Sequence, residues 1–268
     1  MVIGFFARVA VAVGVLAVAG LASAGASPFA SQVVDFNQGT GGVASYAVPG
    51  NVLGSPTRYT GSLTPFPGAV TPFNSPFGSD ELYSIGSGGF ITVRFDVPVT
   101  NDPNNPFGID LLVFGNSFFF DSINFEPVAN SLSSDGGLIE VSPDGSLWTP
   151  VPGSVADGLW PTLGYTDGSD PFGGAAGAAM TDFTKPVDPS FSWTGKNYAQ
   201  LVAGYNGSGG GAGVDIGALG LSQISYVRVS HSGTGNVEID AFSDVSPIPA
   251  PASLLALVGV FAVSGRRR

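Results

Sequence analysis

The chain has 268 residues, with 20 acidic residues, nine basic residues and no cysteine. All 20 acids lie between Asp35 and Asp244, where only five basic residues accompany them, so this stretch has a net charge of −15. Such a charge argues against nucleic acid as a partner and suits calcium or neutral polysaccharide better. The absence of cysteine excludes disulfide bonds and thiolate-based zinc sites.

The first 24 residues have the pattern of a secretory signal peptide. Arg8 supplies a positive charge, and the apolar run of residues 9–21 is shorter than an ordinary membrane span. Ala22 and Ala24 then place small residues at the positions that a signal peptidase reads. We therefore expect residues 1–24 to form a signal helix that signal peptidase removes; a retained membrane anchor is the alternative.

Residues 246–268 carry a second pattern with three parts: a proline-rich spacer, the short apolar segment 252–265 and a terminal basic cluster. A helix as short as this segment crosses only part of a bilayer core, and the basic cluster would stay on the cytoplasmic side. The pattern thus predicts a C-terminal helix with transient membrane association. Its key residues are Pro249, Ala250, Pro251, Arg266, Arg267 and Arg268.

This layout resembles the PEP-CTERM sorting signal, whose pattern is Pro-Glu-Pro, an apolar helix and a basic end. The chain departs from that pattern at Ala250, which stands where the family has glutamate. The resemblance implies an exosortase-like sorting protease as a partner and a final location at the cell envelope, at the cell surface or outside the cell. A plain C-terminal membrane anchor is the alternative.

Residues 25–245 are expected to form one domain of β-strands joined by turns, since the chain holds 40 glycines and 21 prolines. In a long N-terminal arm, strands are predicted at residues 32–36 and 43–48. Residues 90–97 alternate between apolar and polar side chains, as a half-buried strand does. The unbroken apolar run of residues 109–114 instead indicates a central strand that is buried on both faces.

The second half of the domain is predicted to contain a hairpin and two closing strands. Residues 138–141 and 147–151 flank Ser142-Pro143-Asp144-Gly145, which has proline and glycine where a tight turn favours them. Residues 225–230 and 236–242 alternate, and the short loop between them predicts that they pair as antiparallel neighbours.

Residues 155–213 form a long, irregular, glycine-rich insert between these elements. One helix is expected within it, because four apolar residues recur at the spacing of a helix face. These residues are Tyr198, Leu201, Val202 and Tyr205.

The hairpin IEVSPDGSLWTPV and the closing strands SYVRVS and NVEIDAF are similar to motifs of discoidin-like, galactose-binding-type jelly rolls, in the same order. The resemblance implies an all-β fold, an antiparallel β-sandwich of jelly-roll type. It also implies a structural calcium ion at Glu238, which matches a last-strand glutamate of that family. Asp240 lies on the same strand face, two residues further on. The alternative is that both carboxylates lie on a solvated face.

Enzyme motifs are scarce. His231 is the only histidine and lies in a predicted loop, and neither a Gly-x-Ser-x-Gly elbow nor a His-Glu-x-x-His motif is present. With 20 acids, chance pairs of carboxylates are common, so they give little support to glycoside hydrolysis. We therefore expect no enzyme activity; a polysaccharide hydrolase and a purely structural matrix component are the alternatives.

Binding of carbohydrate would use exposed aromatic rings, which stack on sugar faces. Trp160, Tyr165 and Trp193 in the insert are the predicted platforms, whereas Trp148 is assigned to the core. Asp167 and Asp170 are a second candidate for calcium. The sequence thus predicts an exported, non-enzymatic protein of the cell surface or extracellular matrix that binds carbohydrate and is stabilised by calcium.

Overall fold

The computed structural model describes residues 27–124, 126–233 and 235–246. The predicted signal segment, including Ala22 and Ala24, and the sorting residues from Pro249 onwards lie outside these ranges. Within them, no helix combines the length and the apolar character needed to cross a bilayer. The described chain is built mainly from antiparallel sheets, as the sequence predicts.

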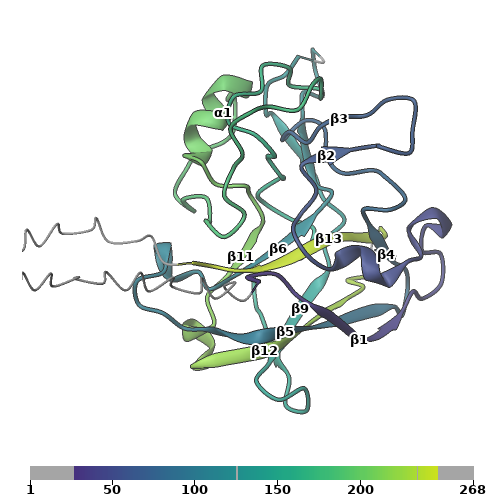
Figure 1. Cartoon of the computed structure of the whole chain (residues 1–268), viewed down its shortest axis with the longest axis vertical. Helices are drawn as coiled ribbons and strands as arrows, with labels where there is room; N and C mark the ends of the chain where they lie inside the picture. Colours follow the sequence, from purple (N-terminus) through teal and green to yellow (C-terminus); the bar gives the residue numbers. More distant parts are fainter. Residues whose placement is uncertain (1–26, 125, 234, 247–268) are drawn as a thin grey trace, which may run out of the picture.

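Two antiparallel sheets lie face to face in the lower part of Figure 1 and form a β-sandwich. The five-stranded sheet has the order β1 (Gln32–Asn37), β5 (Phe90–Thr100), β12 (Gln223–Ser230), β9 (Leu138–Ser142) and β10 (Thr149–Pro150). The four-stranded sheet has the order β11 (Ala212–Val214), β6 (Leu111–Gly115), β13 (Val237–Asp244) and β4 (Tyr83–Ile85).

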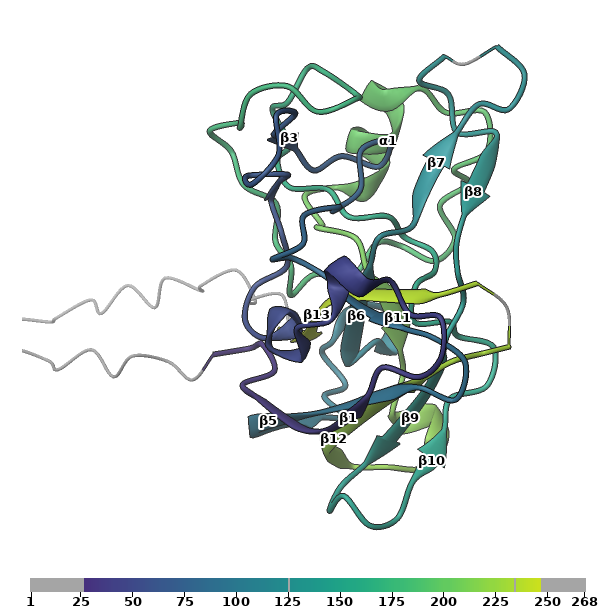
Figure 2. The same cartoon turned by 90° about the vertical axis from the view of Figure 1, so that its right-hand side faces the viewer.

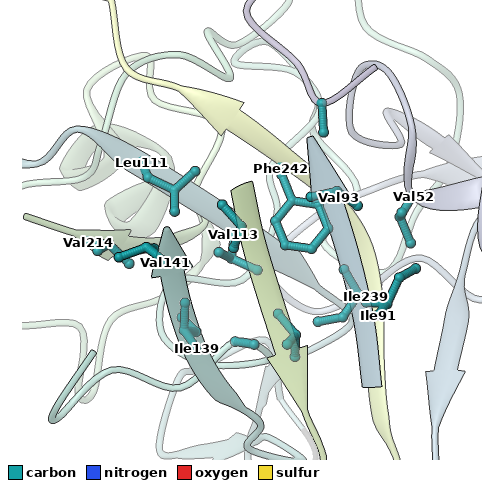
Figure 3. Packing of buried hydrophobic residues seen from close by; sticks show 14 of the residues in the cluster. Val52, Ile91, Val93, Leu111, Val113, Ile139, Val141, Val214, Ile239 and Phe242 are labelled. Atoms are coloured by element: carbon teal, nitrogen blue, oxygen red, sulfur yellow. The ribbon is translucent and has the colours of Figure 1, made fainter. Parts of the chain in front are cut away.

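An apolar core fills the space between the two sheets. Ile91 and Val93 from β5 point into it from one side, and Val113 and Phe242 point into it from the other, as Figure 3 shows. Each of these side chains is at most 1% exposed. The alternation of apolar and polar residues along β5 thus marks the face that packs into the core. Apolar burial is the main force that holds the two sheets together.

A lobe of loops and short elements covers the outer face of the four-stranded sheet (Figures 1 and 2). We define the lobe as residues 57–78, 117–133 and 159–210. Its elements are β2 (Tyr59–Thr60), β3 (Gly68–Ala69), β7 (Phe118–Phe120), β8 (Ser131–Ser133) and α1 (Tyr198–Tyr205). Short 3-10 helices occur elsewhere at Ala44–Tyr46, Pro49–Val52, Pro106–Gly108 and Gly217–Leu219.

Strand β6 is buried on both faces, and this confirms the prediction from its unbroken apolar run. Leu111 and Val113 face the core of the sandwich, whereas Leu112 and Phe114 pack beneath the lobe. Phe114 meets Phe183 of the lobe edge to face, with ring centroids 5.4 Å apart. The lobe is therefore packed onto the sheet as a third layer.

Helix α1 confirms the predicted helix within the insert. Asn197 caps its N-terminus, because its side chain accepts the Gln200 N–H at 3.0 Å while the Gln200 side chain accepts the Asn197 N–H at 3.1 Å. Asn206 ends the helix in the left-handed conformation, with φ of 49°. The apolar face of the helix packs into the lobe.

The strand predicted at residues 43–48 was wrong. The 3-10 helix Ala44–Tyr46 occupies this stretch instead, and a second one, Pro49–Val52, follows directly after residue 48. Pro49 lacks an N–H and has a fixed φ, so it suits the first turn of a helix better than the interior of a sheet.

The predicted pairing of the last two strands was also wrong. β12 pairs with β5 and β9 in one sheet, whereas β13 pairs with β6 and β4 in the other. The short loop between them crosses from one layer to the other, a distance of about 10 Å in packed sheets. Each strand has a partner on both sides within its own sheet, and this excludes a direct pairing.

Gly86, at the end of β4, allows a close backbone approach that no side chain permits. A Cβ there would lie 2.4 Å from both the Gly42 nitrogen and the Thr40 carbonyl oxygen. We expect Gly86→Ala to lower the free energy of unfolding by about 2 kcal/mol, since both obstructing atoms belong to the backbone. Gly50→Ala is the matched control, because nothing lies within 4 Å of its Cβ position. Equal melting temperatures for the two variants in differential scanning calorimetry would contradict this packing.

Candidate functional site

Glu238 and Asp240 are buried and do not lie on a solvated face. They are 7% and 2% exposed, although they point away from the sandwich core as the alternation of β13 requires. Asp240 accepts the Thr57 N–H and the Thr57 hydroxyl, each at 2.8 Å. Thr57 belongs to the lobe, so Asp240 fastens the lobe to the sheet.

Several carboxyl groups in this buried layer hold their protons unusually tightly. Burial raises the pKa of Asp240 to about 7 and that of Asp157 to about 7. Burial also raises the pKa of Glu238, and the nearby charge of Asp135 adds to this effect. A carboxylate in an apolar layer loses its hydration, so the neutral form is favoured.

The geometry gives no ready calcium site at Glu238 and Asp240. Both oxygens of Asp240 are taken by Thr57, and those of Glu238 accept hydrogen bonds from Ser84 at 3.3 Å and Asn116 at 3.1 Å. Across the ranges that the structure describes, no group of three or more acidic, histidine or cysteine residues is arranged to hold a metal ion.

The second candidate pair for calcium, Asp167 and Asp170, stabilises an exposed loop. The two oxygens of Asp167 accept the N–H groups of Ala178 and Ala179 at 2.9 and 3.1 Å. Asp170 accepts the Phe172 N–H at 3.0 Å. These contacts occupy the carboxylates within the loop itself.

The predicted sugar platforms of the insert are mainly packing residues. Trp160 is 7% exposed and stacks on Phe191, with centroids 5.7 Å apart. Trp193 is half-buried, and its ring stacks on the buried Phe119 at 4.7 Å. Tyr165 is half-buried too. The tryptophan rings thus hold the lobe together, and the structure does not bring the three rings onto one open surface.

His231 lies in the loop between β12 and β13. Its Nδ1 accepts the Gly233 N–H at 2.9 Å, and its Nε2 lies 2.9 Å from the Gly235 carbonyl oxygen. Both contacts are local to the loop, so the histidine stabilises a turn.

A different set of residues forms a depression on the solvent side of the five-stranded sheet. We call it the outer-face depression; its volume is about 250 Å³. Its residues come from β1, β5 and β12 and from the hairpin between β9 and β10. They are Val34, Asp35, Thr92, Asp144, Gly145, Trp148, Tyr226 and Arg228.

Strand register places its central residues side by side. Arg228 on β12 is opposite Thr92 on β5 and Glu140 on β9, and Thr92 is in turn opposite Asp35 on β1. All four side chains point away from the core, because successive residues of a strand face opposite sides. A row of three charged side chains and one hydroxyl group therefore crosses four strands.

Arg228 and Trp148 form the centre of the depression. The guanidinium carbon of Arg228 lies 4.0 Å from the centroid of the Trp148 ring, and Arg228 Nε donates to the Thr92 hydroxyl at 3.1 Å. A guanidinium has five N–H donors in one plane. Because the contact with Thr92 uses Nε, the Nη donors of Arg228 remain available to a ligand in the depression that this residue lines.

The predicted turn at residues 142–145 positions Trp148. Gly145 has a φ of 77° and donates its N–H to the Ser142 hydroxyl at 2.9 Å. Asp144 accepts the N–H groups of Ser146 and Leu147 at 2.7 and 3.0 Å, and these bonds lower the pKa of its carboxyl group. The Asp144 carboxylate is therefore charged beside a ring that the hairpin holds in place.

The assignment of Trp148 to the core was wrong. It is half-buried and lies in the hairpin just before β10, where its ring covers Arg228. Tyr226 and Arg228 were visible in the sequence as the outward residues of an alternating strand. The position of Trp148 above them depends on the pairing of β9 with β12, which the sequence does not state.

No protein-family model matches this chain, and no curated protein matches it. The case for its function therefore depends on the geometry of the described residues.

Proposed function

We propose that this chain is an exported, non-enzymatic surface protein whose β-sandwich binds neutral carbohydrate in the outer-face depression. The contact between Trp148 and Arg228 carries the proposal. It combines an aromatic ring with free N–H donors at an exposed, mixed surface. Sugars present apolar C–H faces to rings and hydroxyl groups to polar side chains, so such a surface suits them.

The charges around the depression favour a neutral ligand. Asp35 and Asp144 supply hydrogen-bond acceptors, and Arg228 supplies donors, so hydroxyl groups find partners of both kinds. Acidic residues outnumber basic ones by 20 to nine in the whole chain. This excess repels acidic polysaccharides over a long range, whereas neutral glycans are unaffected.

Export and sorting complete the proposed role. The signal-peptide pattern and the similarity of residues 246–268 to PEP-CTERM signals support delivery to the cell surface or the matrix outside it, with signal peptidase and an exosortase-like protease as partners. Two stacked antiparallel sheets with the hairpin of residues 139–151 support a jelly roll of the galactose-binding type. A structural calcium ion has no comparable support in the geometry of Glu238 and Asp240.

A glycan array followed by calorimetric titration tests the carbohydrate site. We expect the purified protein to bind at least one neutral glycan class among cello-, xylo- and mannohexaose or the array's other neutral glycans. Trp148→Ala should weaken the affinity at least about tenfold, which is about 1.4 kcal/mol. Trp193→Ala is the matched control and should leave the affinity within about twofold, since its ring packs inside the lobe.

The two alternatives give different results in the same experiment. A hydrolase would release reducing ends from the bound glycan over time, whereas a binding protein leaves it intact. A structural component without a ligand would bind nothing on the array. A loss of affinity in Trp193→Ala with none in Trp148→Ala would move the site to the lobe and contradict the proposal.

A further inference from the structure

A second depression, of about 230 Å³, opens on the lobe and has no lining residue in common with the carbohydrate site. Its walls are phenylalanine rings from β7 and from the loops that contain Phe73 and Phe172. Two carboxylates, those of Asp121 and Glu126, complete its lining. The rings are those of Phe73, Phe118, Phe119, Phe120 and Phe172.

The rings form walls at an angle to each other. Phe73 and Phe172 are 6.2 Å apart with planes at 64°, and Phe118 and Phe120 are 6.0 Å apart with planes at 52°. Phe172 is 57% exposed and Phe120 is 38% exposed, so two rings at this depression remain in water. Faces of aromatic rings carry negative charge density, and rings set at angles can surround a cation.

The carboxylates strengthen this negative character. Asp121 is 3% exposed, and its Oδ1 accepts the Ile123 N–H at 2.9 Å and the Asn130 side-chain amide at 3.2 Å. The Ile123 N–H lowers the pKa of Asp121, so the carboxylate is charged at neutral pH. Of the described residues that line the depression, none is basic.

From the angled rings and the carboxylate beside them, we propose that this depression binds a trimethylammonium group. An alkylated ammonium ion is less strongly hydrated than a primary one and has methyl groups that contact rings well. The lining has few donors and acceptors, so it would read the hydroxyl groups of a sugar poorly. A volume of about 230 Å³ is large enough for such a headgroup.

Titration with choline chloride, followed by amide chemical shifts at constant ionic strength, tests this site. We expect saturable shifts around Phe120 and Phe172, and an affinity at least about fivefold higher for choline than for 3,3-dimethylbutanol, its uncharged analogue. Asp121→Asn should weaken choline binding, because it removes the negative charge. The amide oxygen of the asparagine can still accept the Ile123 N–H, so the local structure is kept.

Replacement of an exposed ring should leave the fold intact, so its effect on choline binding can be measured separately from stability. Phe172→Ala should reduce the affinity for choline at least about threefold, whereas Phe66→Ala, a change to a 79% exposed ring outside the depression, should leave it unchanged. Trp148→Ala should also bind choline normally, which separates this site from the carbohydrate site. Equal affinity for choline and its uncharged analogue, or no saturable shift, would overturn the proposal.

A second arm identifies the source of the group. Free choline and phosphatidylcholine vesicles present the same headgroup, and sedimentation with the vesicles would show that the headgroup is reached on a membrane. Binding of free choline without sedimentation would assign the site to small soluble cations. Sedimentation that persists in Phe172→Ala would contradict a role for this depression.

Discussion

Raising the pH from 5 to 8 is expected to lower the melting temperature of this protein by about 10 °C. Asp240 has a pKa of about 7 in the fold and about 3.9 in the unfolded chain. Between these values the folded state keeps a proton that the unfolded state has lost, so stability falls as the pH rises. For Asp240 alone the loss between pH 5 and pH 8 is on the order of 3 kcal/mol, since only the interval from pH 5 to the folded pKa contributes. Asp157 and Asp244, each with a pKa of about 7, act in the same direction.

Asp240→Asn should remove part of this pH dependence. The amide oxygen can still accept the Thr57 N–H, and the amide N–H can donate to the Thr57 hydroxyl, so the link to the lobe is kept. Asp188→Asn is the control, since hydrogen bonds from Ser190 lower the pKa of Asp188 from an ordinary value that already lies below this pH window. Thermal unfolding by circular dichroism at pH 5, 6, 7 and 8 gives the measurement. A melting temperature that is constant or rises towards pH 8 would contradict the burial of these carboxyl groups.

Phe114→Ala is expected to lower the free energy of unfolding by about 3–5 kcal/mol. The Phe114 side chain is fully buried between the four-stranded sheet and the lobe, where it contacts Phe183. Its removal leaves a cavity in the layer that joins the two parts, and the melting temperature should fall by about 10 °C. Far-ultraviolet and near-ultraviolet circular dichroism should report one common transition, because Phe183 of the lobe packs in one apolar cluster with Phe114 of the sheet.

Phe66→Ala provides the matched control for this change. Phe66 is 79% exposed on the lobe, so the same truncation there should shift the melting temperature by no more than about 2 °C. Separate transitions for the two signals, with only the lobe affected by Phe114→Ala, would show that the lobe folds by itself. The account of three packed layers would then fail.

Periodicity predicted most of the individual elements. Three patterns each predicted an element that is present in the fold. They are the alternation in β5 and β12, the apolar run of β6, and the helical spacing of Tyr198 and Tyr205. These signals are short-range: each depends on which side chains can be buried together within one element. The strand expected at residues 43–48 failed because Pro49 favours a helical turn there.

Assembly of these elements depends on contacts that sequence patterns do not record. Thr57 and Asp240 are 183 positions apart, yet their hydrogen bonds attach the lobe to the sheet. This contact helps to bury Asp240, for which a solvated position was one of the two alternatives from the sequence. The outer-face depression has the same origin, because Asp35, Trp148 and Arg228 meet only through the order of strands in the sheet. The candidate residues of the insert were therefore chosen by composition, while the half-buried ring of Trp148 was assigned to the core.

Chemical-shift mapping with a bound neutral oligosaccharide tests the carbohydrate proposal most directly. The titration would use cellohexaose, xylohexaose and mannohexaose and follow backbone amides and the three indole N–H signals. We predict that shifts gather at the Trp148 indole and at the amides of Asp35, Tyr226 and Arg228. Shifts gathered at Trp160 and Trp193 in the lobe, or no shift with any of the three sugars or with a neutral glycan taken from the array, would contradict the outer-face site.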